Sequence, residues 1–297
     1  MKDDSPSSTA LLIAGSVAWM SQNSEFRHLV PPGASEASAL FVKTRSRGAG
    51  LLLQTLESRW FRWLAVAIER LTIPGIQLHY LVRKRFIEEV VRDSLHDGFS
   101  QVIIVGAGFD TLALRLHSTF PNARFIEIDH PATQQYKQHT LKIQQAVHAN
   151  MGFLPVDLTR QSIQECLSAS PLYRRDADTI FIVEGVLMYL TTDEVAAIFR
   201  FMGKGGDSKR RVAFTFMEPD SKGHTAFHNA SRAVDFWLRL RGEPFRWGIH
   251  RDALPTFLES VGFSLNEIAT PQTFQVRYGI REAPLAEGEY IGVAERR

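Results

Sequence analysis

Two glycines and two carboxylates, about 20 residues apart, are the first residues of this sequence with the types and spacing of a ligand site. Gly106 and Gly108 directly follow the β-branched residues 102–105, while Glu127 and Asp129 end a second apolar stretch. Glycine permits a sharp turn with free amide N–H groups, and a carboxylate can accept from the two hydroxyls of a ribose. The pattern indicates a nucleoside site in which Asp129 is better placed than Glu127. Solvated edge charge is the alternative.

The residues after the second glycine separate two classes of nucleotide cofactor. A dinucleotide fingerprint has a third glycine at the position of Thr111, where helix and strand pack closely around a pyrophosphate. Asp110 stands beside the same turn, and its carboxylate would repel a pyrophosphate in a poorly solvated site. The turn therefore favours a nucleoside without phosphates, or one that carries a cation.

Alternating strands and helices must position these residues. Short runs that are apolar on both faces are typical of strands buried in a parallel sheet, and apolar residues at helical spacing separate them. We expect strands over residues 102–105, 124–129, 152–156, 178–183 and 211–216, and helices over residues 79–92, 131–147, 195–201 and 254–261. This succession predicts a doubly wound, mainly parallel α/β sheet with helices on both faces.

Four short motifs follow one another along the chain. They read Val-Gly-Ala-Gly-Phe-Asp-Thr at 105–111, Glu-Ile-Asp-His-Pro at 127–131, Val-Asp-Leu-Thr at 156–159 and Val-Glu-Gly-Val-Leu-Met-Tyr-Leu at 183–190. In type and order they resemble the motifs of the leucine carboxyl methyltransferase and tetracenomycin O-methyltransferase-like family, and the resemblance covers about residues 80–270. Leu112 departs from that family, which usually has arginine there; this bears on local helix contacts rather than on the cofactor.

The resemblance implies a cofactor and a fold. The cofactor is S-adenosyl-L-methionine, and the fold is a class I, Rossmann-like methyltransferase sheet whose terminal strands, 264–268 and 290–293, are antiparallel. Gly106, Gly108 and Asp129 would then hold the nucleoside part of the cofactor.

The family pattern assigns the rest of the cofactor to four more residues. Arg83, on the helix before the glycine turn, aligns with an arginine that binds the carboxylate of the methionine part, a pairing that guanidinium makes well. A solvated basic helix face is the alternative. Glu184 corresponds to a glutamate of the cofactor site. Asp157 and Leu158 correspond to a pair that binds adenine through a carboxylate and a backbone amide, although Asp157 could also cap the next helix.

Length and composition agree with one large enzyme domain. The 297 residues are 44% hydrophobic, enough for a sizeable core, and no low-complexity linker divides them. We expect a single class I methyltransferase domain over residues 1–297, made of a helical N-terminal cover (1–78), a cofactor-binding core (79–216), a lid and helix (217–262) and terminal strands (263–297).

Charge, cysteine content and hydropathy limit the partners and the compartment. The 34 basic and 32 acidic residues form no long run of one sign, so we expect no nucleic-acid partner. Cys166 is the only cysteine, which excludes an intramolecular disulfide and favours a reducing compartment, here the cytoplasm. The apolar run 10–20 follows an acidic start, and charges interrupt residues 59–82. We therefore expect a helix at 10–20 rather than a signal peptide, and no membrane span.

Histidines and aromatic residues beyond the fifth strand suit a lid over a second pocket. Histidine is the residue type whose ordinary pKa suits a general base near neutral pH, which makes His224 and His228 candidates, and Tyr189 follows the fourth strand. A surface or packing role is the alternative for the histidines. Their spacing would place both on one helix face, but no third ligand accompanies them, so we predict no metal site.

These observations predict S-adenosylmethionine-dependent methyl transfer to a hydroxyl or carboxylate oxygen of a small molecule. The enzyme would position the acceptor oxygen and, for a hydroxyl, remove its proton. A nicotinamide-dependent oxidoreductase and a catalytically silent, cofactor-binding regulatory protein are the rival interpretations. We predict a small-molecule methyl acceptor as the partner and make no prediction of the oligomeric state.

Overall fold

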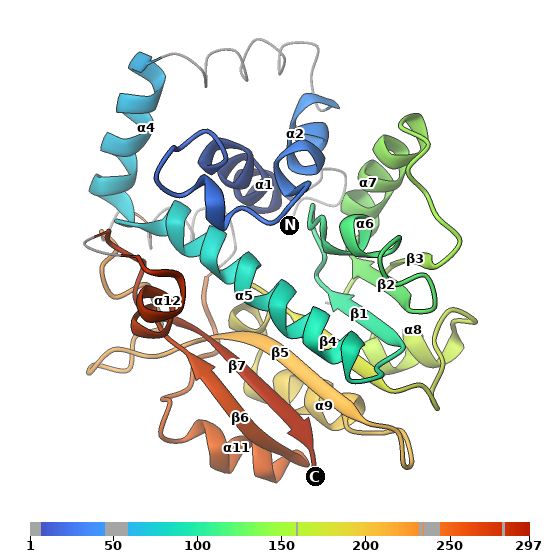
Figure 1. The fold of residues 1–297 in the computed structure, drawn as a ribbon. Helices are drawn as coiled ribbons and strands as arrows, with labels where there is room; N and C mark the ends of the chain where they lie inside the picture. The colour runs from blue at the N-terminus through green and yellow to red at the C-terminus, as the bar shows by residue number, and fades with distance from the viewer. Residues whose placement is uncertain (1–6, 45–58, 159, 232–233, 235–243, 281–282) are drawn as a thin grey trace.

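The computed structural model describes residues 7–44, 59–158, 160–231, 234, 244–280 and 283–297. At its centre is a seven-stranded sheet with the strand order β3-β2-β1-β4-β5-β7-β6 (Figure 1). The strands are β1 (Gln101–Val105), β2 (Arg124–Asp129), β3 (Met151–Pro155), β4 (Thr179–Val183), β5 (Arg210–Met217), β6 (Phe263–Ala269) and β7 (Glu289–Arg296). The predicted doubly wound, mainly parallel sheet is confirmed.

The direction of the last two strands matters for the site. β6 and β7 pair antiparallel, as expected, and β7 also runs antiparallel to β5. The first residue of β7, Glu289, therefore lies opposite Met217, the last residue of β5. A residue that begins β7 thus reaches the same edge of the sheet at which the parallel strands end.

The sheet is buried on both faces, which explains the uninterrupted apolar run of β1. Val102 and Ile104 belong to the core on the face that α5 covers, whereas Ile103 and Val105 belong to the core under α9 and α11. Figure 1 shows α5 crossing the near face of the sheet with α9 and α11 behind it. Such burial on two sides is the usual condition of parallel strands.

Helices connect and cover the strands. The helices expected at residues 10–20, 79–92, 131–147, 195–201 and 254–261 are present, and α12 is among those that the sequence did not predict. The helices are α1 (Ser8–Met20), α2 (Ala34–Thr44), α4 (Arg59–Thr72), α5 (Ile76–His96), α6 (Leu112–Leu116), α7 (Pro131–Ile143), α8 (Ile163–Ala169), α9 (Thr192–Met202), α11 (Leu254–Ser260) and α12 (Pro271–Tyr278), with short 3₁₀ turns at Arg27–Leu29 and Leu187–Tyr189.

The N-terminal helices α1 and α2 lie together beside the start of α5 (Figure 1). The sequence of α1 is apolar around most of its circumference, so it is stable only where neighbours cover it. Its Ala14 and Val17 are buried, and Ser7 caps its first turn by accepting a hydrogen bond from the N–H of Ala10 at 3.2 Å. The apolar run expected at residues 10–20 is therefore a packed helix.

Two further expectations concern membrane spans and the lid. None of the helices in the described part of the chain is long and apolar enough to cross a membrane. Within the expected lid, residues 232–233 and 235–243 lie outside the described residues.

Candidate cofactor-binding site

The glycine turn after β1 requires both of its glycines. Gly106 and Gly108 have φ values of +69° and +50°, in the left-handed region that side chains disfavour. The N–H of Gly106 donates to the carbonyl of Ile128 at 2.8 Å, which ties the turn to β2. A Cβ on Gly106 would collide with Cγ2 of Val186, and one on Gly108 would lie 2.9 Å from Cβ of Ala10 on α1. The backbone conformation and the close neighbours together exclude larger residues.

Asp129, the last residue of β2, lies against this turn. Its Oδ2 accepts a hydrogen bond from the N–H of Gly108 at 2.5 Å, and its Oδ1 accepts from the N–H of His130 at 2.6 Å. Burial raises the pKa of Asp129 above its usual value despite these two hydrogen bonds. The bonds fix the orientation of the carboxylate, and each oxygen keeps a second lone pair for another donor.

Glu127 serves a different purpose from Asp129. It is 1% exposed and pairs with the equally buried Lys137, with 2.6 Å between Oε2 and Nζ. Lys137 also donates to the backbone carbonyl of Asp110 at 2.6 Å, so the pair holds the glycine turn through its backbone. Burial raises the pKa of Glu127 to about 7 in spite of the nearby ammonium. Of the two carboxylates of β2, Asp129 is the one placed at the turn itself.

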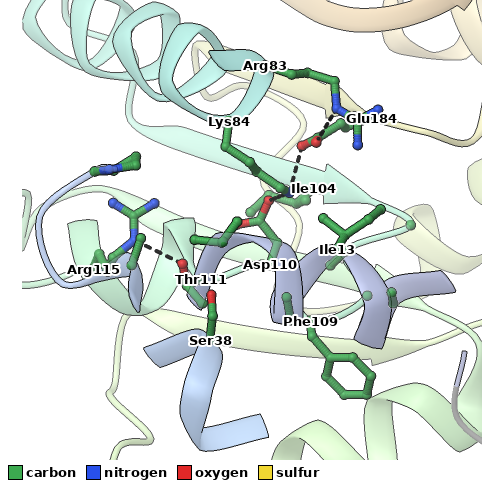
Figure 2. Close-up of a pocket in the computed structure, with 18 residues that line it drawn as sticks. Ile13, Ser38, Arg83, Lys84, Ile104, Phe109, Asp110, Thr111, Arg115 and Glu184 are labelled. Carbon is green, nitrogen blue, oxygen red and sulfur yellow. Dashed lines mark hydrogen bonds and ion pairs between the residues drawn. The ribbon is translucent and has the colours of Figure 1, made fainter. Parts of the chain in front are cut away.

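Two cations of α5 meet a carboxylate that follows β4. The Nε of Arg83 donates to Oε1 of Glu184 at 2.8 Å, and the Nζ of Lys84 donates to Oε2 of the same residue at 2.8 Å. Lys84 also forms an ion pair with Asp110 of the glycine turn. Figure 2 shows Lys84 between Glu184 and Asp110, with Arg83 on the other side of Glu184. These contacts join α5, β4 and the glycine turn through alternating charges.

The charge state of this group follows from its contacts. Burial lowers the pKa of Lys84, but the charges of Asp110 and Glu184 outweigh it and leave the pKa raised. Burial likewise opposes ionisation of Asp110, yet Lys84 holds the pKa of that carboxyl well below its usual range. Lys84 and Asp110 are therefore both charged at neutral pH.

A second carboxylate holds Arg83 from the opposite side. Nη1 of Arg83 donates to Oε1 and Oε2 of Glu289 at 2.9 and 2.7 Å, and Nε2 of His79 lies 2.9 Å from Oε2. Burial alone would raise the pKa of Glu289, but Arg83 and His79 lower it to about 2. Burial would lower the pKa of Arg83, and the charges of Glu289 and Glu184 raise it instead. Arg83 and Glu289 thus form an ionised pair inside the protein.

A cavity opens beside the glycine turn, between these charges and the N-terminal helices (Figure 2). Its polar wall comes from α5, the turn and Glu184, and its apolar wall comes from α1 and the start of α2. The residues that supply the apolar wall include Ile13, Ala14, Val17 and Ala34. Ser38 of α2 and Thr111 of the turn add hydroxyl groups. The cavity therefore has one charged side and one apolar side.

Four of the predicted cofactor residues line this cavity, namely Arg83, Gly106, Gly108 and Glu184. Asp129 is joined to them through its hydrogen bond with Gly108.

Asp157 and Leu158 lie apart from the cavity lining, after β3 at the same edge of the sheet. Asp157 is half-buried and pairs with Arg160, with 3.3 Å between Oδ2 and Nε. The alternative that Asp157 caps the next helix is wrong, because Ser162 is the N-cap of α8 and accepts from the N–H of Glu165. Asp157 remains a candidate for adenine.

The predicted catalytic residues lie outside the cavity lining as well. His224 and His228 are exposed and belong to a turn segment, so the helical spacing considered for them is wrong. The backbone N–H of His224 donates to Asp220, and Nε2 of His228 contacts the carbonyl of Glu218 at 2.8 Å. Tyr189 is half-buried, and its ring centroid lies 5.7 Å from that of Phe245. The structure brings none of these three residues together with Arg83 and Glu184.

Sequence reasoning missed four residues of the site: Lys84, Asp110, His79 and Glu289. Lys84 is adjacent to Arg83 on α5, and Asp110 was considered only as a source of repulsion. The signal for Glu289 is topological, since an antiparallel strand beside β5 begins where the parallel strands end. Nothing in the sequence alone pairs residue 79 with residue 289.

The donor set fits S-adenosylmethionine. That cofactor carries a ribose diol, an ammonium, a carboxylate and a sulfonium. Asp129 offers acceptor oxygens for the diol at the glycine turn, Glu184 offers an anion for the ammonium, and Arg83 offers a guanidinium for the carboxylate. A pyrophosphate finds a less suitable partner here, because Asp110 is ionised beside the turn.

The strand order, the antiparallel seventh strand and this donor set define an α/β fold of the S-adenosylmethionine-dependent methyltransferase class. The chain belongs to the leucine carboxyl methyltransferase family, whose model matches residues 34–203. The resemblance noted in the four sequence motifs is thereby confirmed.

Similar proteins carry names of the same class. A protein of Bacillus subtilis, provisionally named the S-adenosyl-L-methionine-dependent methyltransferase YktD, is 28% identical over 198 residues, which are 64% of this chain and 62% of that protein. A relative from Mycolicibacterium smegmatis with the same provisional class name is 29% identical over 221 residues, 72% of this chain and 67% of the relative. A third, from Mycobacteroides abscessus, is 32% identical over 51% of this chain and 48% of its own. The chain thus spans from about half to two thirds of these relatives.

Solved structures are similar to part of this chain. Magnesium protoporphyrin IX methyltransferase from Synechocystis, with bound S-adenosylhomocysteine, superposes with a TM-score of 0.46 and 18% sequence identity, over 74% of this chain and 87% of that one. A methyltransferase structure from Nostoc punctiforme gives a TM-score of 0.48 at 12% identity, over 73% and 61% of the two chains.

Proposed function

We propose that this protein transfers the methyl group of S-adenosyl-L-methionine to an oxygen atom of a small molecule. One observation carries the proposal: beside the glycine turn, a carboxylate and two cations meet in one buried group, Glu184 with Arg83 and Lys84. This group offers a partner for each charge of a zwitterionic amino-acid group, and the carboxylate of Asp129, bound to the same glycine turn, offers acceptors for ribose hydroxyls. Membership of the leucine carboxyl methyltransferase family supports the same activity.

Each part of the cofactor has a proposed partner. Arg83 binds the carboxylate of the methionine part, Glu184 binds the ammonium, and Asp129 accepts from the ribose hydroxyls. Asp157 and the backbone amide of Leu158 bind adenine. When bound, the cofactor supplies a methyl group that its sulfonium already activates. The chain's own residues therefore have to bind the cofactor and the acceptor, orient them and exclude water.

The acceptor oxygen is proposed to belong to a hydroxyl or a carboxylate. A carboxylate acceptor needs no base, whereas a hydroxyl must lose a proton. For a hydroxyl we propose His224, His228 or Tyr189 as the base, and residues 217–262 as the lid of the acceptor pocket. A histidine suits this role because its unperturbed pKa lies near neutrality.

Calorimetry and a product assay test the proposal. We expect S-adenosylmethionine and S-adenosylhomocysteine to bind, and we expect titration with NAD or NADP to give no heat of specific binding. Incubation with isotopically labelled S-adenosylmethionine and a metabolite extract should yield a labelled small molecule. Binding of NAD that S-adenosylmethionine does not displace would favour an oxidoreductase instead. Cofactor binding without any labelled product would favour a regulatory protein.

The base is tested separately. His224→Ala and His228→Ala are compared with the unaltered protein at saturating cofactor, over a range of pH. Loss of turnover with a changed pH profile in one variant identifies that histidine. If both variants keep normal turnover and pH dependence, neither is the base, and Tyr189 or a carboxylate acceptor has to be considered.

A further inference from the structure

We infer that Glu289, together with His79, is a positioning residue that fixes the Arg83 guanidinium so that its remaining donors face the ligand's carboxylate. The inference rests on the proposed function, because it concerns the site proposed for S-adenosylmethionine. Neither residue lines the cavity, so both act through Arg83.

The orientation of Arg83 is fixed on three sides. Nη1 is bound by both oxygens of Glu289, Nε is bound by Glu184, and Cζ lies 4.8 Å from the ring centroid of Tyr80. Among the described residues, Nη2 donates to no other group. Since Arg83 is only 3% exposed yet lines the cavity, the donors of Nη2 are the ones left for a ligand there.

Glu289 supplies the counter-charge that the buried guanidinium of Arg83 needs. It is 1% exposed, as is His79, so no water competes for the carboxylate. A guanidinium without this anion would lean toward Glu184, its other carboxylate partner, because a buried charge is strongly disfavoured without a counter-charge. Its remaining donors would then no longer face the ligand's carboxylate. Glu289 thus keeps Arg83 in place for that carboxylate.

His79 orients Glu289 in turn. Its Nε2 lies 2.9 Å from Oε2 of the ionised carboxylate, so Nε2 carries the proton and donates it. Nδ1 is buried with no hydrogen-bond partner among the described residues. The rings of Phe227 and Phe274 pack edge-on against the imidazole, with centroids 6.3 and 6.4 Å away, and hold it in this plane. The order of support therefore runs from His79 to Glu289 to Arg83.

Two ligands that differ by one group distinguish positioning from general support of the fold. S-adenosylmethionine has the carboxylate, and decarboxylated S-adenosylmethionine lacks it but keeps the sulfonium, the ammonium and the nucleoside. In Glu289→Gln, we expect the Kd for S-adenosylmethionine to rise tenfold or more, the scale of a lost charge-assisted hydrogen bond, while the Kd for the decarboxylated analogue changes less than about threefold. Calorimetry measures both values.

Glu295→Gln is the matched control. Glu295 lies on the same strand and also pairs with an arginine, Arg211, with 2.7 Å between Oε1 and Nε, but far from the cavity lining. We expect neither Kd to change in this variant. Should Glu289→Gln not fold, His79→Leu removes one hydrogen-bond donor to Glu289 and leaves the carboxylate, and a three- to tenfold rise in Kd confined to S-adenosylmethionine is expected.

The outcomes separate the two hypotheses. If the unaltered protein binds neither ligand, the proposed function is wrong. If it binds both, and Glu289→Gln or His79→Leu weakens them equally, Glu289 merely supports the fold and the inference is overturned. Unchanged affinity for S-adenosylmethionine in the variants overturns it too.

Discussion

At the scale of single residues, Asp129 is a carboxylate with its direction set in advance. Both of its oxygens accept backbone N–H groups, one from the glycine turn and one from the residue that follows β2. A ligand hydroxyl therefore meets an acceptor that need not be reoriented on binding, which reduces the entropy lost. The same bonds connect the ligand site to the backbone of the turn.

Removing this carboxylate should weaken the cofactor and leave the fold intact. We expect Asp129→Ala to cost about 1.5–3 kcal/mol of binding free energy, roughly a ten- to hundredfold increase in Kd for S-adenosylmethionine. Asp129→Asn keeps one acceptor oxygen, so its Kd should lie between those of the natural protein and of Asp129→Ala. Calorimetry gives the Kd values, and circular dichroism checks the fold. An unchanged Kd in the alanine variant would place the ribose elsewhere.

Glu127 should make stability depend on pH. Burial raises its pKa from 4.5 to about 7, against the charge of Lys137. Between these two pH values the folded protein binds a proton that the unfolded chain has released, so this contribution is full below pH 4.5 and is lost as the pH rises through 7. The loss is on the order of 3 kcal/mol by this linkage.

Glu127→Gln removes this titration. We expect the free energy of unfolding of the natural protein, measured in urea, to fall relative to that of Glu127→Gln as the pH rises from 4.5 to 7, and to level off above it. If the difference between the two proteins is the same at every pH, Lys137 keeps Glu127 ionised throughout and the expectation is wrong.

At the scale of elements, the glycine turn combines an unusual backbone with close packing. Gly106→Ala should destabilise the protein by more than the roughly 1–2 kcal/mol of a left-handed alanine, since its Cβ would also collide with Val186. Gly279→Ala is the control, because Gly279 has a similar φ of +65° and nothing within 4 Å of the added atom. Denaturant unfolding compares the two variants, and equal losses of unfolding free energy would show that Val186 moves aside.

The strands were predictable because each one that ends at the site is an apolar run buried on both faces. The predicted and observed bounds of β2 agree, and those of β1 and β4 differ by one residue. α12 escaped prediction because only Pro271 and Phe274 of its residues are buried, so no apolar face stands out at helical spacing. Its start is marked instead by a capping box between Thr270 and Thr273.

Some residues of the site could be grouped from the sequence and others could not, depending on how the fold brings them together. Gly106, Gly108 and Asp129 follow strands, and parallel strands end at one edge, so spacing along the chain was enough to group them. Glu289 could not be found in that way, because its place depends on the reversed direction of β7. His224 and His228 were given a helical spacing that only the local backbone, turned around Asp220, could correct.

At the scale of the whole molecule, the cofactor should stabilise the fold measurably. Its proposed partners come from α5, the turn after β1 and the segments at the ends of β2, β3 and β4, so one ligand would join five elements. At a concentration of 100 times Kd, mass action adds about 2.7 kcal/mol, which raises Tm by roughly 4 °C for a chain of this size. Differential scanning fluorimetry measures the shift. NAD at the same concentration should give none, and an equal shift with NAD would contradict the expectation.

The ion pair between Arg83 and Glu289 joins residues that are 206 positions apart. During synthesis at about 5–20 residues per second, α5 would leave the ribosome roughly 10–40 s before its partner strand exists. For that interval Arg83 lacks one of the two carboxylates that hold it in the folded protein, which disfavours its burial under α5 on the growing sheet. We therefore expect nascent chains that stop short of residue 289 to fail to bind the cofactor, however complete the glycine turn already is.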